Sequence, residues 1–101
     1  MNPLLFTGSI LAAAVVFASA PARAADDNAY YARHRKQFIS YERAAQIARQ
    51  AMKGGRVTDV EFDHAPRDDH FDVEVRAADG REYDVKIDAR SGKVRYVKRD
   101  D

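Results

Sequence analysis

The chain has 101 residues, with 17 basic and 16 acidic side chains, a formal net charge of +1 and no cysteine. The absence of cysteine excludes a disulfide framework, a thiol nucleophile and a cysteine-ligated zinc site. A near-neutral chain also has no long-range field that would steer it onto nucleic acid.

Residues 1–24 are predicted to be a signal sequence. An apolar and small-residue run, residues 10–20, is followed by Ala22-Arg23-Ala24, a small-x-small triplet typical of a signal-peptidase site. The polar stretch from Thr7 to Ser9 leaves the run well short of the roughly 20 residues that span a bilayer. Cleavage after Ala24 removes one basic residue and leaves equal numbers of basic and acidic side chains. We therefore expect a periplasmic or secreted protein without a transmembrane segment after cleavage.

Residues 25–38 are interpreted as an N-terminal arm. The arm contains three aromatic and three basic side chains, which are Tyr30, Tyr31, Phe38, Arg33, Arg35 and Lys36. Aromatic and basic residues together suit contact with an anionic membrane surface or an acidic partner. A short helix that packs Tyr31 or Phe38 on the domain, or a mobile tether, explains the arm equally well, and so few basic residues favour these two alternatives.

A helix is predicted from Ser40 to about Lys53. Ser40 is a suitable N-cap, and Glu42 in the first turn faces the positive end of the helix dipole. Apolar residues recur at spacings of three and four and form one stripe, made of Ala44, Ala45, Ile47, Ala48, Ala51 and Met52. Gly54-Gly55 is expected to end the helix, because glycine adopts the left-handed C′ conformation without a Cβ clash.

From Arg56 the apolar period changes from 3.6 to 2, which indicates four strands with one dry and one wet face each. The predicted inward side chains are Thr58, Val60 and Phe62, then Phe71, Val73 and Val75, then Tyr83, Val85 and Ile87, and finally Val94 and Tyr96.

The length of each turn can be predicted from the residue numbers. Opposed residues of an antiparallel pair point to the same face, so the numbers of all opposed pairs in a hairpin add up to one constant, and a turn of the right parity sets apolar residues opposite apolar residues. Parity selects a three-residue loop, Ala78–Gly80, with Gly80 in the left-handed position. The predicted opposed pairs are Phe62–Phe71, Val73–Val85, Val75–Tyr83, Ile87–Val94, Val85–Tyr96 and, on the wet face, Asp88–Lys93. The fold class is therefore α+β, with one amphipathic helix packed on a four-stranded antiparallel β-meander.

These elements resemble the PepSY domain family in their order and spacing. The resemblance rests on Ile39-Ser40-x-Glu42-x-Ala44-x-x-Ile47-Ala48, on Gly54-Gly55, and on the closing run from Asp79-Gly80 through Tyr83, Val85 and Ile87-Asp88-Ala89 to Gly92-Lys93-Val94. It covers residues 39–98, so residues 39–101 are interpreted as a PepSY-like domain. The resemblance implies a non-enzymatic envelope or secreted module related to domains in the propeptides of thermolysin-like metallopeptidases. It carries no catalytic residues onto this chain.

Two polar groups of residues invite a chemical interpretation. His64 and His70 flank the acidic loop Ala65–Asp69, and imidazole with carboxylate suits Zn²⁺ or Cu²⁺, but no metal-ligand spacing such as HExxH is present. Acidic residues also gather on the outward face of the first two strands, whereas basic residues occupy the last strand: Asp59, Glu61, Asp63, Asp72 and Glu74 against Lys93, Arg95, Lys98 and Arg99. General acid catalysis requires a carboxyl group in a pocket, so an open face indicates solvated charge. We assign no catalytic, cofactor-binding or metal-binding residue.

The sequence therefore favours an exported, non-enzymatic binding or regulatory module that contacts another envelope protein, with a peptidase as the first candidate. Its expected contact surfaces are the wet sheet face and an exposed strand edge, Arg56–His64 or Lys93–Lys98, which can accept an extended peptide. The alternative is an envelope sensor or scavenger that binds a metal or small ligand through the His64–His70 loop or the charged face.

Overall fold

The computed structural model describes residues 22–100. The predicted signal sequence, residues 1–24, lies outside the described residues except for its last three, and the first helix begins at Ala22. The described elements are α2 (Ala22–Arg33), a 3₁₀ turn (Arg35–Gln37), α3 (Tyr41–Ala51), β2 (Arg56–Asp63), β3 (His70–Arg76), β4 (Glu82–Asp88) and β5 (Val94–Arg99). Among them, no helix combines the length and the apolar character of a membrane span.

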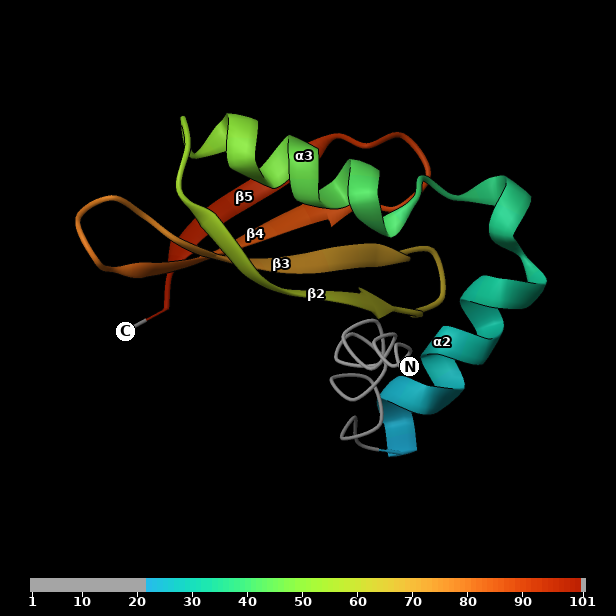
Figure 1. The fold of residues 1–101 in the computed structure, drawn as a ribbon. Coiled ribbons are helices and arrows are strands. Elements are labelled where there is room, and N and C mark those ends of the chain that lie inside the picture. Colours follow the sequence, from blue (N-terminus) through green and yellow to red (C-terminus); the bar gives the residue numbers. More distant parts are fainter. Residues whose placement is uncertain (1–21, 101) are drawn as a thin grey trace, which may run out of the picture.

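The four strands form one antiparallel sheet in the order β2-β3-β4-β5. Helix α3 lies across one face of this sheet, and α2 stands beside the end of β2 (Figure 1). The fully buried residues come from α3, from the inward face of the sheet and from the turn after β4, and they are Ala44, Ala48, Phe71, Val73, Val75, Val85, Ile87 and Ala89, with Phe62 at 2% exposure. The predicted α+β class, a helix on an antiparallel meander, is confirmed.

Both ends of α3 are capped, but the C-terminal cap differs from the prediction. Ser40 is the N-cap as expected, and its Oγ accepts the Arg43 N–H at 2.9 Å. At the other end the left-handed C′ residue is Lys53, with φ 57°, so the assignment of C′ to glycine is wrong. The Gly54 N–H donates to the Arg49 carbonyl at 2.9 Å, which makes Gly54 the C″ residue of a Schellman motif.

The strand register agrees with turn parity over most of the sheet. Phe62 lies opposite Phe71, Val73 opposite Val85, and Ile87 opposite Val94, as predicted. Gly80 has a φ of 85° and closes the predicted three-residue loop, since the Ala77 N–H donates to the Arg81 carbonyl at 2.9 Å. The β3–β4 hairpin therefore aligns the core of the sheet.

Two irregularities overturn individual inward assignments. A register shift between Val57 and Asp59 leaves Thr58 exposed, and Val57 packs opposite Val75 in its place. A second shift, between Lys86 and Ile87, puts Val97 rather than Tyr96 opposite Val85. Each shift inserts one unpaired residue and reverses the parity beyond it.

The arm is a packed helix, one of the alternatives that the sequence left open. The Tyr31 hydroxyl donates to the Ile39 carbonyl at 2.9 Å, and the Tyr31 ring meets the Phe62 ring edge-on with centroids 5.2 Å apart. The Tyr41 hydroxyl donates to Asn28 Oδ1 at 2.7 Å, which links α2 to the start of α3. Helix α2 therefore extends the apolar core past the end of the sheet.

The link from α3 to β2 makes Gly55 sensitive to substitution. Gly55 has a φ of 97°, and an added Cβ would lie 2.9 Å from the Arg76 carbonyl oxygen. Gly80 has a similar φ of 85° but no atom within 4 Å of an added Cβ, which makes it a matched control.

We expect Gly80→Ala to lower the free energy of unfolding by about 1 kcal/mol through backbone strain alone. Gly55→Ala should cost about 1–2 kcal/mol more, because the backbone must also shift. Equal losses in urea denaturation would show that the close approach to Arg76 carries no energetic weight.

Candidate functional site

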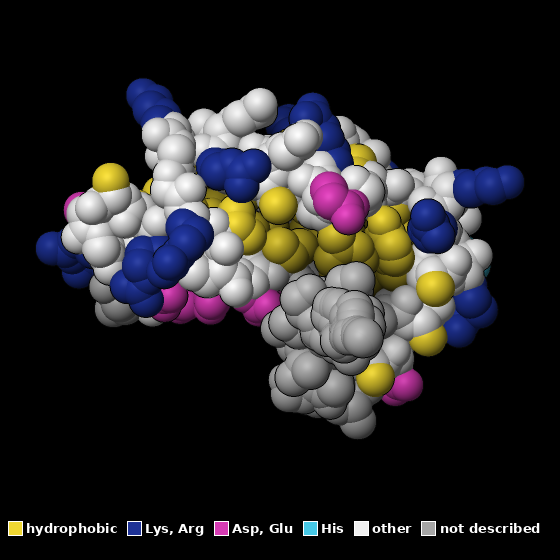
Figure 2. Space-filling view, in the orientation of Figure 1, with side chains coloured by type: hydrophobic (Ala, Val, Ile, Leu, Met, Phe, Trp, Pro, Cys, Tyr) yellow, Lys and Arg dark blue, Asp and Glu magenta, His cyan; other side chains and the backbone are white. Residues whose placement is uncertain are grey.

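The outward sheet face carries opposed negative charges. Asp59 lies opposite Glu74, and Glu74 lies opposite Asp84, so three carboxylates form a row across β2, β3 and β4. In the next row Glu61 lies opposite Asp72. Like charges directly opposite each other destabilise a sheet. Figure 2 shows acidic side chains along the lower margin of the sheet, below an apolar strip.

The pKa values of these carboxyl groups are raised by burial and, to a smaller extent, by the charges of neighbouring carboxylates. Burial, and then the charges of Glu82 and Asp84, raise the pKa of Glu74. Burial and the charge of Asp100 raise the pKa of Asp84, and burial with the charge of Asp59 raises that of Glu61. The face therefore favours neutralisation, either by protons or by a bound positive charge.

A groove of about 370 Å³ lies on this face. Its lining consists of six carboxylates and one aromatic ring, from Asp59, Glu61, Asp72, Glu74, Asp84, Asp100 and Tyr96. Tyr96 is 45% exposed, and Lys86 Nζ lies 5.8 Å from the centroid of its ring. The sequence prediction missed Tyr96 here, because the register shift in β5 turns this side chain outward.

The basic residues of β5 are partly drawn into internal contacts. Arg95 pairs with both Asp68 and Asp88. Lys98 lies opposite Asp84. The Asp88–Lys93 pair forms through the backbone, with the Asp88 N–H donating to the Lys93 carbonyl at 2.8 Å, while the Asp88 carboxylate accepts from Ser91 and Arg95.

The two histidines of the predicted metal loop occupy separate environments. His64 Nδ1 lies 2.6 Å from Asp69 Oδ1, and its ring stacks on Tyr30 at 3.7 Å. His70 instead faces two carboxylates, with Nε2 at 3.4 Å from Asp63 Oδ2 and 3.3 Å from Asp72 Oδ2. Among the described residues no cluster joins both histidines. Two clusters there could hold an ion, Asp63 with His70 and Asp72, and Glu74 with Asp84 and Asp100, and only the first contains a histidine.

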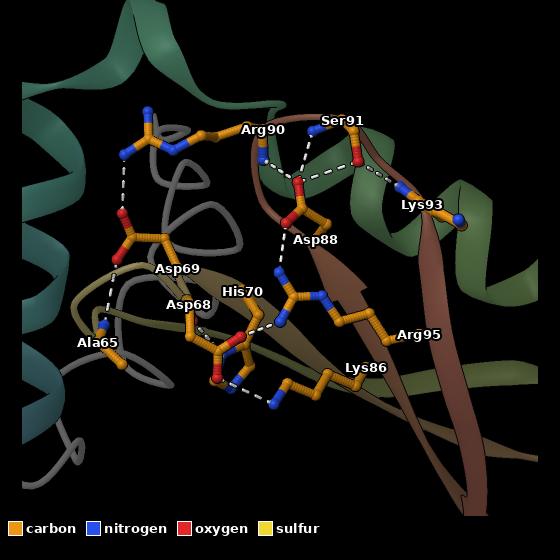
Figure 3. A network of polar contacts seen from close by, with 10 residues as sticks. All are labelled: Ala65, Asp68, Asp69, His70, Lys86, Asp88, Arg90, Ser91, Lys93 and Arg95. Atoms are coloured by element: carbon orange, nitrogen blue, oxygen red, sulfur yellow. Dashed lines mark hydrogen bonds and ion pairs between the residues drawn. The ribbon is translucent and has the colours of Figure 1, made fainter.

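The loop that carries these histidines is tied to the β4–β5 hairpin by a polar network (Figure 3). Asp69 Oδ1 accepts the Ala65 N–H at 3.1 Å, and Asp69 Oδ2 accepts from Arg90 at 3.0 Å. Asp68 accepts from Lys86 at 3.2 Å and also pairs with Arg95. These contacts fix the end of the outward face where His70 lies.

Removing one charge from the acidic row tests the repulsion. A raised pKa means that the folded chain holds a proton that the unfolded chain has released, so stability falls as the pH rises through the window between the ordinary and the raised carboxyl pKa. We expect Glu74→Gln to raise the free energy of unfolding at pH 7 by about 0.5 kcal/mol and to weaken the fall of this free energy as the pH rises above 4.5, the ordinary pKa of the Glu74 carboxyl.

Glu82→Gln is a useful comparison, because Glu82 repels Glu74 but also pairs with Arg76 at 3.1 Å. Its removal relieves one repulsion and breaks one ion pair, so we expect a smaller gain in stability than for Glu74→Gln. A Glu74→Gln variant that is less stable than the parent at pH 7 would contradict the repulsion.

Helix α3 and the sheet together form the part of the chain that matches a known protein family. No curated protein and no solved structure matches the chain significantly. A family described as "Peptidase propeptide and YPEB domain", PepSY, matches residues 38–98, which include α3 and nearly the whole sheet. Domains of this type are associated with the propeptides and the regulation of peptidases, and are typically found in the envelope or outside the cell. The chain belongs to the PepSY family.

Proposed function

We propose that this chain is an exported binding module that regulates a peptidase or another envelope protein by direct contact and performs no chemistry itself. The observation that carries the proposal is the PepSY match over residues 38–98, because this family is of a propeptide or inhibitor type. A propeptide-type domain acts through the surface that it presents to a partner. The export signal predicted for residues 1–24 supports the location.

The chemistry of the outward face supports binding rather than catalysis. Its carboxylates lie in cross-strand rows along a groove, and none of them is buried. A general acid needs a site that excludes water and lies next to a nucleophile or base. Repelling carboxylates on an open surface instead attract a positively charged partner, and such complementarity steers association and selects partners.

An inhibition assay tests the peptidase form of the proposal. We expect the purified chain to slow cleavage of a small chromogenic peptide by a thermolysin-like metallopeptidase. An unrelated protein of similar size controls for simple competition as a substrate. No inhibition at roughly 100 µM, where even a weak complex forms, would remove this class of peptidase as the partner. A crosslinking pull-down from the native envelope that captures nothing above background would contradict the binding function itself.

A second candidate function, binding of a divalent metal ion, is favoured by the environment of His70. Its Nδ1 lies 2.7 Å from the Asp68 carbonyl oxygen, while Nε2 faces Asp63 and Asp72. Metal-binding histidines commonly donate their second N–H to a backbone carbonyl in this way. Calorimetric titration with Zn²⁺ should then give heat that His70→Ala abolishes and His34→Ala preserves. A titration of the parent chain without heat of binding would end this candidate.

A further inference from the structure

The sheet has two edges within residues 22–100, and they differ in what lies beside them. β2 and β5 are the outermost strands. Beside β2, a second groove of about 330 Å³ runs between the strand and helix α3. Its lining is largely apolar and is formed by Tyr41, Glu42, Ala45, Val57, Thr58, Asp59 and Val60. The apolar strip in Figure 2 lies between α3 and the acidic margin of the sheet.

The backbone of β2 is oriented to accept another strand. In an antiparallel pair of strands, hydrogen-bonded and non-hydrogen-bonded residue pairs alternate. The Ala77 N–H donates to the Arg81 carbonyl and the Ala89 N–H donates to the Asp69 carbonyl, so the hydrogen-bonded pairs between β3 and β4 contain the odd-numbered residues of β3. The even-numbered residues of β3 therefore bond to β2, where they lie opposite Asp59, Glu61 and Asp63. By the same alternation, the N–H and C=O groups of Val60 point toward the open edge. A strand added there would continue the sheet beneath α3.

Such a strand would meet different surroundings on its two faces. Alternate side chains point to opposite faces, so one set would enter the apolar groove between Ala45 and Val57. The other set would lie beside Asp59 and Glu61 on the acidic face. The two faces together select a segment that alternates apolar and basic residues.

The carboxylates at this groove have no basic partner among residues 25–98. Glu42 and Asp59 line the groove, and within that range no lysine or arginine forms an ion pair with Glu42, Asp59 or Glu61.

We propose that the β2 edge and the groove under α3 bind an extended segment of a partner protein in which Lys or Arg alternates with apolar residues. The proposal rests on the binding function given above and names the surface and the partner chemistry. Main-chain hydrogen bonds to β2 supply affinity. The apolar groove and its acidic rim, formed by Glu42, Asp59 and Glu61, supply specificity.

The probe for this surface is a synthetic peptide of alternating Lys and Val, carrying a fluorophore and titrated with the protein expressed from the full 101-residue sequence. We expect binding by fluorescence anisotropy, and on the order of tenfold weaker binding of the matching Glu–Val peptide. Two N-methylated isomers, blocked on alternate backbone N–H groups, should differ, because only one set of N–H groups faces β2. Equal binding of the Lys–Val and Glu–Val peptides, or of the two isomers, would overturn the proposal.

Ala45→Arg tests the groove directly, since a long side chain at this half-buried position fills it. Gln50→Arg adds the same charge at an exposed position of α3 outside the groove lining. We expect Ala45→Arg to weaken Lys–Val binding at least tenfold and Gln50→Arg to leave it within twofold. Unchanged binding by a folded Ala45→Arg variant would overturn the groove assignment.

Glu42→Lys keeps the test informative if Ala45→Arg fails to fold, because Glu42 is exposed. This charge reversal should weaken binding of the Lys–Val peptide and strengthen binding of the Glu–Val peptide. If neither affinity moves, the acidic rim has no part in recognition and the proposal fails.

Two further outcomes distinguish this proposal from two alternatives, a second copy of the chain in the groove and a partner that binds another surface. Strand β5 itself mixes basic and apolar residues, so a second copy of the chain is an alternative occupant of the groove. In that case analytical ultracentrifugation would show a molecular mass that rises with protein concentration, and Ala45→Arg would abolish the rise. This result would overturn the proposal of a different partner protein. A protein captured from the envelope equally well by the parent and by Ala45→Arg would overturn the β2 surface while leaving the binding function intact.

Discussion

Asp69 lies where the β2–β3 loop, the β4–β5 hairpin and the arm meet, and its side chain is 4% exposed. Its carboxylate is satisfied by the Ala65 N–H, by His64 and by Arg90. Arg90 in turn donates to Gln37 at 2.8 Å and lies over the ring of Phe38. Because a buried carboxylate without donors is costly, these three segments hold one another in place. The positions of α2 and α3 relative to the sheet depend on this junction.

The two faces of the sheet contribute in opposite directions to stability. The inward face packs on α3 and supplies the buried core, whereas the outward face opposes carboxylates in adjacent strands. Between β2 and β3 the outward face opposes carboxylates to one another, whereas Arg76 and Glu82 pair opposite charges at the far end of β3 and β4, as a surface selected only for stability would do. Violations of such local rules are expected at functional surfaces, where stability is exchanged for recognition. The acidic face is therefore the part of the molecule most suited to a partner.

Turn parity predicted most of the fold because the β3–β4 hairpin has a regular three-residue loop, and every pair from Phe71–Ile87 to Val75–Tyr83 follows from it. The inward positions predicted for Thr58 and Tyr96 are wrong, because each residue lies beside a bulge that reverses the alternation. The sequence has no pattern at these positions that marks an inserted residue. The C′ position was also missed, because a lysine there is rare and the following glycine offered a simpler explanation. The acidic residues could be found from alternation, but the Asp69–Arg90 contact joins residues 21 positions apart and has no local signal.

The claim that the β2 edge is the partner surface is tested most directly by photo-crosslinking in intact cells. A photoreactive amino acid is placed at Thr58, which is exposed on β2, and for comparison at Val97 on β5 and at Gln50 on α3. The account predicts a defined protein adduct from position 58 and none from position 50 or 97. Adducts from position 97 with none from position 58 would contradict it.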